Sequence, residues 1–181
     1  DEALTLLRKH TREELSGILD TAANTFDHTV TAFMSESYRG LRKTMNRIDD
    51  EKIHLKQVKR IGTLGVAHLD NNTAIEKGLY YYQGNDFASE IIFSIRRLAE
   101  PMKDHIDNNF SPLSPVQKDD FGKVSEQIIS FLRNCATMIR KNDYIGFEEL
   151  IAESITLMNQ LTALKKGELK RIQGQSGSTK V

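Results

Sequence analysis

Two acidic residues, Asp86 and Glu90, are the strongest candidates for chemistry in this sequence. They stand four residues apart in a segment with helical periodicity, so both carboxylates are expected on one face of a helix. Carboxylate oxygens bind hard cations when other ligands complete the coordination shell. The pair therefore predicts a site for a divalent or iron-type metal ion. The competing interpretation is a solvated helix face.

Two further sets of ionisable residues follow weaker patterns. Glu100, Asp104 and Asp107 form an acidic ladder beside a histidine, near the expected end of the same helix. Negative charge at a helix C-terminus is mildly unfavourable, which leaves some room for a binding role. Glu51 and His54 have the Glu-x-x-His spacing of di-iron bundles, but the sequence contains no second motif of this kind, which such sites need.

The sequence lacks the usual signatures of catalysis. It contains neither G-x-x-x-x-G-K-[ST] nor G-x-G-x-x-G, the patterns that bind nucleotide phosphates. The only cysteine, Cys135, cannot form an internal disulfide or a zinc site alone, and we expect it to be a small core residue. We therefore expect a protein that is not an enzyme, with no catalytic residue.

The charge distribution argues against nucleic acid as a partner. Lys and Arg total 25, as do Asp and Glu, so the chain has no net field that attracts polyanions. A basic run from Arg39 to Arg60 could face membrane headgroups or a transporter surface, or be a solvated helix end. No apolar run approaches the ~18 residues of a transmembrane helix, so we expect no membrane span in this chain.

Apolar residues recur every three or four positions in five segments, a pattern typical of amphipathic helices in a bundle. Gly62 and Gly65 fall inside the second segment, where they either weaken the helix or let a neighbouring helix approach closely. A polar tail from Gly174 to Val181 is predicted to be flexible. The expected helices cover about residues 11–48, 49–69, 73–107, 115–140 and 144–172.

Local signals mark several helix ends. Asp49 and Asp50 suit the start of the second helix, and Thr73-x-x-Glu76 has the form of a capping box for the third. Ser114-Pro115-Val116-Gln117 is the clearest signal, with a capping serine and a proline at the first helical position. Lys141-Asn142-Asp143 predicts a tight break before the fifth helix.

The segment from Asp70 to Pro112 carries a resemblance to a known family. Its GLYYYQGNDFASEIIFSI, followed by EPMKDHIDNNFSPL, resembles the cytosolic C-terminal domain of some bacterial PiT-type inorganic phosphate transporters. That domain is similar to the PhoU proteins that regulate phosphate uptake. The closing GELKRI and STKV resemble the run that leads into the domain's final helix.

PhoU-like domains consist of two three-helix repeats. The resemblance therefore implies a first repeat over residues 1–112 and an incomplete second repeat over 113–181, with the last helix missing. Family members bind metal clusters through Glu-x-x-x-Asp motifs. When Asp86-Phe87 is aligned with the Asp-Leu of that motif, the metal positions fall on Ala88 and Ile92, which cannot bind metal. Asp86 and Glu90 fit only in a shifted register.

We thus expect an all-α, elongated bundle of about five long helices. The resemblance implies a non-catalytic regulatory domain of inorganic phosphate transport on the cytoplasmic side of the inner membrane. Its expected partner is the membrane segment of the same polypeptide or another protein, and we also expect a homo-oligomer. The alternative is a general module that dimerises or binds a helix in an open groove. A metal-binding bundle is a third interpretation.

Overall fold

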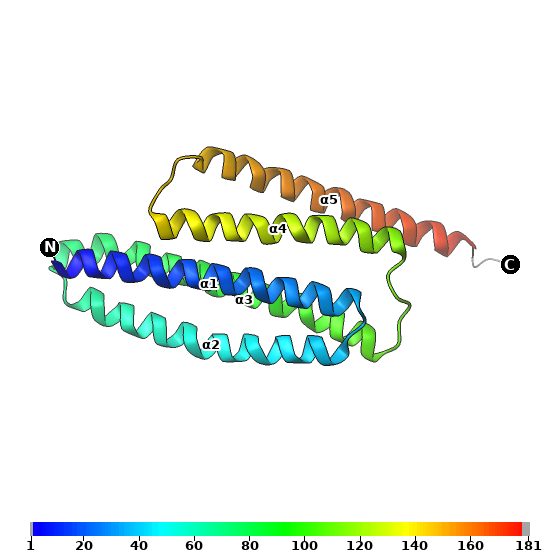
Figure 1. The fold of residues 1–181 in the computed structure, drawn as a ribbon, viewed down its shortest axis with the longest axis horizontal. Helices are drawn as coiled ribbons and strands as arrows, with labels where there is room; N and C mark the ends of the chain where they lie inside the picture. Colours follow the sequence, from blue (N-terminus) through cyan, green and yellow to red (C-terminus); the bar gives the residue numbers. More distant parts are fainter. Residues whose placement is uncertain (1, 179–181) are drawn as a thin grey trace.

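The chain forms an elongated bundle of five α-helices, as the sequence predicts. The computed structural model describes residues 2–178, except for the side chains of residues 71, 74, 75, 77 and 175–178, and it has no β-strand in that range. Figure 1 shows the long helices lying side by side. They are α1 (Glu2–Met34), α2 (Tyr38–Ala67), α3 (Asn71–Asp107), α4 (Pro115–Lys141) and α5 (Phe147–Ser178).

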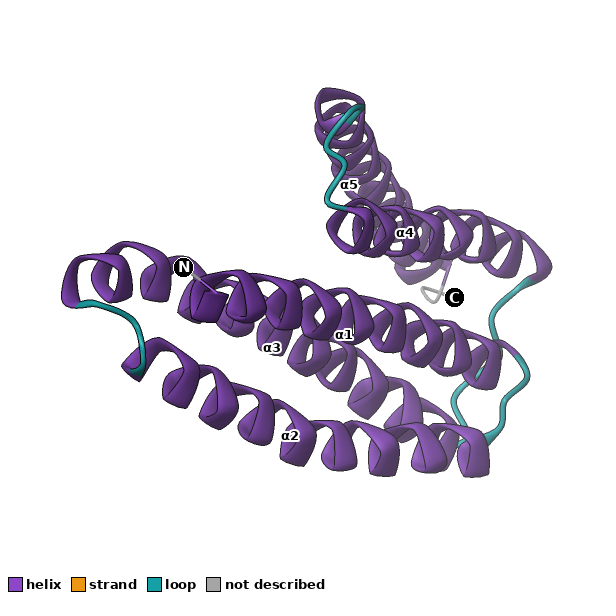
Figure 2. Ribbon diagram, turned by 60° about the vertical axis from the view of Figure 1, so that its left-hand side comes forward, coloured by secondary structure: helices purple, strands orange, loops and turns teal. Residues whose placement is uncertain are grey.

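Helix α1 is the centre of the bundle, because α2, α3 and α4 all pack against it. Helix α5 differs from the others: within the described residues it contacts α4 and no other helix. Figure 2 shows the α4–α5 hairpin projecting from the side of the α1–α3 unit. The predicted boundary between residues 112 and 113 falls in the connection that leads from α3 to α4.

Side chains from three helices build the main core. Ile18, Ala22 and Phe26 of α1 are buried, and Ala22 is fully inaccessible to solvent. Burying one such aliphatic or aromatic side chain contributes about 1.5–3 kcal/mol. Partly buried residues of α4, including Phe121 and Ile128, pack against this cluster. The buried members are Ile18, Ala22, Phe26, Val30, Ile48, Leu55, Ala88, Ile92 and Ile95.

A break at residues 35–37 separates α1 from α2, so the expectation of one helix from Thr11 to Ile48 is wrong. Glu36 takes the left-handed conformation, with φ of 56°. Ser37 then caps α2, because its Oγ accepts a hydrogen bond from the Gly40 amide at 3.0 Å. The chain reverses at this point and α2 returns along α1. The polar turn ends the helix although the apolar spacing continues across it.

Two further boundary predictions are corrected. Asp49 and Asp50 lie inside α2 and do not start a helix. Helix α3 starts at Asn71, because the Asp70 carboxylate accepts the Thr73 amide hydrogen at 3.0 Å, so Thr73-x-x-Glu76 is not its capping box. This hydrogen bond also lowers the pKa of Asp70.

The predicted signals around α4 are confirmed. Ser114 Oγ accepts the Gln117 amide hydrogen at 3.3 Å, and Gln117 Oε1 accepts the Ser114 amide hydrogen at 2.9 Å. Asn142 ends α4 in the left-handed conformation, with φ of 51°. Helix α5 starts at Phe147, later than the predicted Tyr144, after Gly146 at φ of 87°.

The predicted flexible tail is partly helical. Helix α5 continues through residues 174–178, where the sequence predicts a flexible polar segment, and residues 179–181 lie outside the described range. Among the helices described, none has a stretch long and apolar enough to cross a membrane.

The glycines of α2 permit close helix packing, one of the two roles that the sequence suggests for them. The Tyr81 ring of α3 lies directly over Gly62, where a Cβ atom would overlap it. The Tyr81 hydroxyl donates to the Val58 carbonyl oxygen at 2.7 Å, which satisfies this polar group within the interface. Leu7 of α1 approaches Gly65 in a similar way.

Replacing Gly62 with Ala should destabilise the protein by about 1–3 kcal/mol, because the added methyl group displaces the Tyr81 ring. The matched control is Gly17→Ala in α1, where a Cβ atom meets nothing within 4 Å. That variant should gain up to about 1 kcal/mol from helix propensity. Urea denaturation followed by circular dichroism measures both, and equal effects would contradict the packing argument.

Candidate interaction surface

Asp86 and Glu90 are both exposed on α3, and each already has a basic partner. Lys59 Nζ of α2 donates to Asp86 Oδ1 at 3.0 Å. Arg97 Nη2 donates to Glu90 Oε2 at 3.1 Å. Within the described side chains, no three His, Cys, Asp or Glu residues are grouped so as to hold a metal ion. A metal ion bound by Asp86 and Glu90 therefore stays a prediction.

Two residues of the acidic ladder at the end of α3 are also paired with basic side chains. Arg96 Nε donates to Glu100 Oε1 at 2.9 Å, and Lys103 Nζ lies 3.6 Å from Asp104 Oδ1. The neighbouring His105 ring packs edge-on against Phe33, with centroids 5.6 Å apart. These contacts match a structural role for the ladder.

The histidine of the Glu-x-x-His motif in α2 lies beside Glu14 of α1, which also lies near His10. His54 Nε2 lies 3.4 Å from one Glu14 oxygen, and His10 Nε2 lies 3.8 Å from the other. Burial raises the pKa of Glu51, and the negative charge of Glu14 adds to this rise. Sequence spacing does not predict that Glu14 contacts both His10 and His54. The chain reversal between α1 and α2 brings Glu14 close to His54.

The basic run and the cysteine take ordinary places. Residues 39–60 lie along α2, and parts of the run are neutralised by ion pairs such as Lys52–Asp49, at 3.4 Å. Cys135 is half-buried in α4, and burial raises the pKa of its thiol. A low thiolate fraction argues against a reactive cysteine.

Helix α5 carries a row of large apolar side chains that are exposed to solvent. Its members are three or four residues apart from Phe147 to Leu161, and Leu169 follows eight residues later, so the side chains lie on one side of the helix. Their exposed fractions run from 40% to 64%, whereas Leu157, which faces α4, is 7% exposed. We call this set the α5 stripe. It consists of Phe147, Ile151, Ile155, Met158, Leu161 and Leu169.

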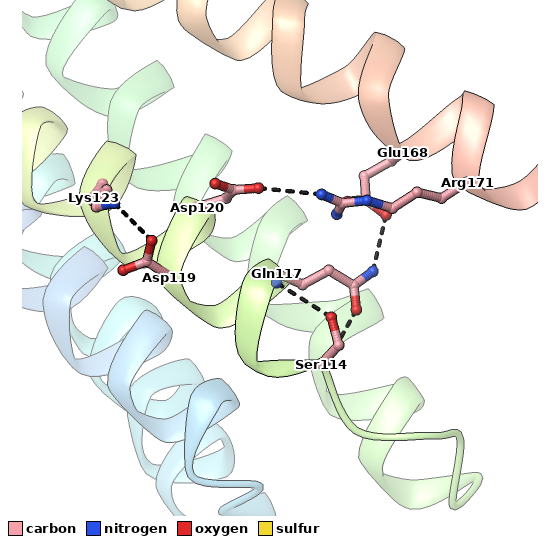
Figure 3. A network of polar contacts seen from close by, with 7 residues as sticks. All are labelled: Ser114, Gln117, Asp119, Asp120, Lys123, Glu168 and Arg171. Carbon is pink, nitrogen blue, oxygen red and sulfur yellow. Dashed lines mark hydrogen bonds and ion pairs between the residues drawn. The ribbon is translucent and has the colours of Figure 1, made fainter.

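Polar contacts fix α5 to α4 beside the α5 stripe. Gln117 Nε2 donates to Glu168 Oε2 at 2.9 Å, and Arg171 Nη2 donates to Asp120 Oδ2 at 3.3 Å. Glu168 and Arg171 also pair with each other along α5. Figure 3 shows these groups between the start of α4 and the second half of α5. The contacts hold the helix while the α5 stripe remains open to solvent.

A second apolar surface lies between α1, α3 and α4. This groove has a volume of about 610 Å³, and its walls include Phe26, Phe87 and Ile128. Among the described residues that line it, Glu90 is the only ionisable one. The groove can accept apolar side chains.

Replacing Gln117 with Glu should loosen α5 while leaving the cap of α4 intact. A carboxylate still accepts the Ser114 amide hydrogen, but it cannot donate to Glu168 and repels it. We expect a loss of about 1 kcal/mol and faster hydrogen exchange in the second half of α5. Adding Glu168→Gln should restore slow exchange, because the donor and the acceptor are then interchanged. Unchanged exchange in the single variant would contradict this role.

Replacing Glu51 with Gln should stabilise the protein at neutral pH and lose this advantage in acid. The raised pKa means that the folded state takes up a proton before the unfolded state does. The wild type therefore gains stability relative to the variant as pH falls through the folded pKa toward the ordinary value of 4.5. Urea denaturation at several pH values measures the difference, and a pH-independent difference would refute the assignment.

Comparisons with known proteins do not identify a relative of this chain. No known protein family, curated protein or solved structure matches this sequence. The α5 stripe, the α4–α5 contacts and the resemblance carried by residues 70–112 are therefore the observations from which a function is inferred.

Proposed function

We propose that the chain is a non-catalytic regulatory domain of inorganic phosphate transport, which acts through contacts with another protein surface. The observation that carries the proposal is the α5 stripe, a row of large apolar side chains on a helix that contacts α4 alone among the described helices. Contiguous exposed apolar patches on soluble domains commonly mark interaction sites.

The link to phosphate transport comes from the sequence resemblance. The arrangement of three mutually packed helices followed by a hairpin is compatible with one three-helix repeat and an incomplete second one. We place the domain on the cytoplasmic side of the inner membrane, with the membrane segment of the same polypeptide as its target. The basic residues along α2 suit a surface that faces anionic headgroups.

The attachment of the hairpin suggests how the domain would transmit a signal. Helix α4 packs on α1, and Arg133 Nη2 donates to Asn24 Oδ1 at 3.2 Å across this contact. A protein that binds the α5 stripe therefore acts on the core through α4. If the hairpin has two positions, a bound protein shifts the equilibrium between them. The size of the shift is set by the difference in its affinity for the two positions.

The test uses phosphate import by cells that carry the full-length gene. First, the coding sequence upstream of Asp1 should encode several hydrophobic spans. Second, Ile151→Glu combined with Met158→Glu should alter the dependence of import on external phosphate, because two charges then interrupt the α5 stripe. Both positions are exposed, so folding should be little affected.

The control is Ile53→Glu, which adds a charge at an exposed apolar position of α2. It should import phosphate like the wild type at equal transporter levels. The proposal fails if the folded double variant also imports like the wild type.

A further inference from the structure

We propose that the α5 stripe binds the α5 stripe of a second copy of this chain, antiparallel, about a twofold axis near Met158. The inference rests on the proposed function in so far as both use this surface. It makes a second copy of the chain the partner that covers the stripe, so that the dimer, and not the stripe itself, contacts the membrane segment. A twofold interface requires one surface that is complementary to itself, and α5 meets this requirement in charge and in apolar pattern.

The first half of α5 is acidic and its second half is mainly basic, with Glu168 there paired to Arg171. Glu148 and Glu149 lie in its first turn, whereas Lys165, Lys166 and Lys170 lie in its second half. An antiparallel copy places the acidic start of one helix beside the basic part of the other. A parallel copy would place like charges together, which is unfavourable.

One pair of residues shows the match in detail. Glu148 and Lys166 are 166 − 148 = 18 residues apart. Since an α-helix has 3.6 residues per turn, 18 residues make about five turns, and both side chains lie on the same side of α5. In an antiparallel pair, each Glu148 then faces Lys166 of the other copy. The midpoint between these positions lies next to Met158.

The ends of the α5 stripe are centred one residue from that midpoint. Met158 stands midway between Phe147 and Leu169 in the sequence. A twofold axis there sets Phe147 of one copy opposite Leu169 of the other, with the two Met158 side chains in contact at the centre. The stripe is about 33 Å long at 1.5 Å per residue. Two hairpins joined in this way would form a four-helix bundle, a common way to bury such faces.

The surroundings of α5 leave space for this partner. The α5 stripe is exposed, and α4 is the one described helix that touches α5. Figure 2 shows the hairpin extending away from the α1–α3 unit, so the α1–α3 unit does not cover α5. The α4–α5 contacts around Glu168 and Arg171 hold the helix in place from an adjacent side.

Analytical ultracentrifugation of the chain over the micromolar range should show a monomer–dimer equilibrium. Met158→Glu should give a monomer, since two carboxylates would meet at the axis, and Ile53→Glu should behave like the wild type. Circular dichroism checks that each variant is folded. A wild-type chain that stays monomeric throughout this range overturns the proposal, as does a folded Met158→Glu variant that dimerises like the wild type.

Charge exchange tests the orientation. Glu148→Lys alone places two lysines together at each end, and Lys166→Glu alone places two glutamates together, so each variant should dimerise more weakly than the wild type. An equimolar mixture of the two should form heterodimers with restored affinity. A mixture no tighter than its components overturns the antiparallel pairing.

Cysteine cross-linking gives a second measure of orientation. Phe147→Cys mixed with Leu169→Cys should form interchain disulfides, and Phe147→Cys alone should not, because its two copies lie at opposite ends. Wild-type chain controls for Cys135. Efficient cross-linking of Phe147→Cys with itself overturns the proposal.

The two proposals fail separately. A monomeric chain whose α5 stripe variants still alter phosphate import overturns the dimer and leaves the regulatory function standing. A dimeric chain whose stripe variants import phosphate normally supports the dimer and rejects the regulatory function.

Discussion

The burial of α1 on three sides is the constraint on which the rest of the structure depends. Helices α2, α3 and α4 can approach it together because its contact positions include small residues such as Ala22 and Ala23, both fully buried. Larger side chains at these sites would hold the neighbours apart. Where α1 is covered, the core is continuous. Where α5 has only α4 beside it, apolar surface remains exposed. The candidate interaction surface is thus the apolar side of the one described helix that does not pack against α1.

Local sequence signals predict most of the helices and several of their ends, because these features depend on interactions between residues close in the sequence. The capping box at Ser114 and the left-handed Asn142 depend on neighbours within one turn, and both are found where expected. Apolar spacing does not predict the turn at residues 35–37, because the spacing continues across it. The serines flanking Glu36 were the available signal, since Ser37 caps α2. Periodicity shows which residues avoid water, but it does not show where the chain reverses.

The candidate site was less predictable, because it depends on which helix faces which. The sequence gives α5 an apolar side but does not say which part of that side α4 leaves uncovered. In the same way, Asp86 and Glu90 share a helix, yet their ion-pair partners come from α2 and from the next turns of α3. The contact of Glu14 with His54 joins residues 40 positions apart (54 − 14). The Lys59–Asp86 and Glu14–His54 pairs follow from tertiary packing and not from spacing.

The packing of α4 on α1 has a consequence for synthesis. A ribosome makes the chain from its N-terminus, so α1, α2 and α3 emerge first and can pack as successive neighbours. The side of α1 that receives α4 stays bare until the last third of the polypeptide has been translated. During that interval the nascent chain exposes an apolar surface of α1, and holdase chaperones bind surfaces of this kind.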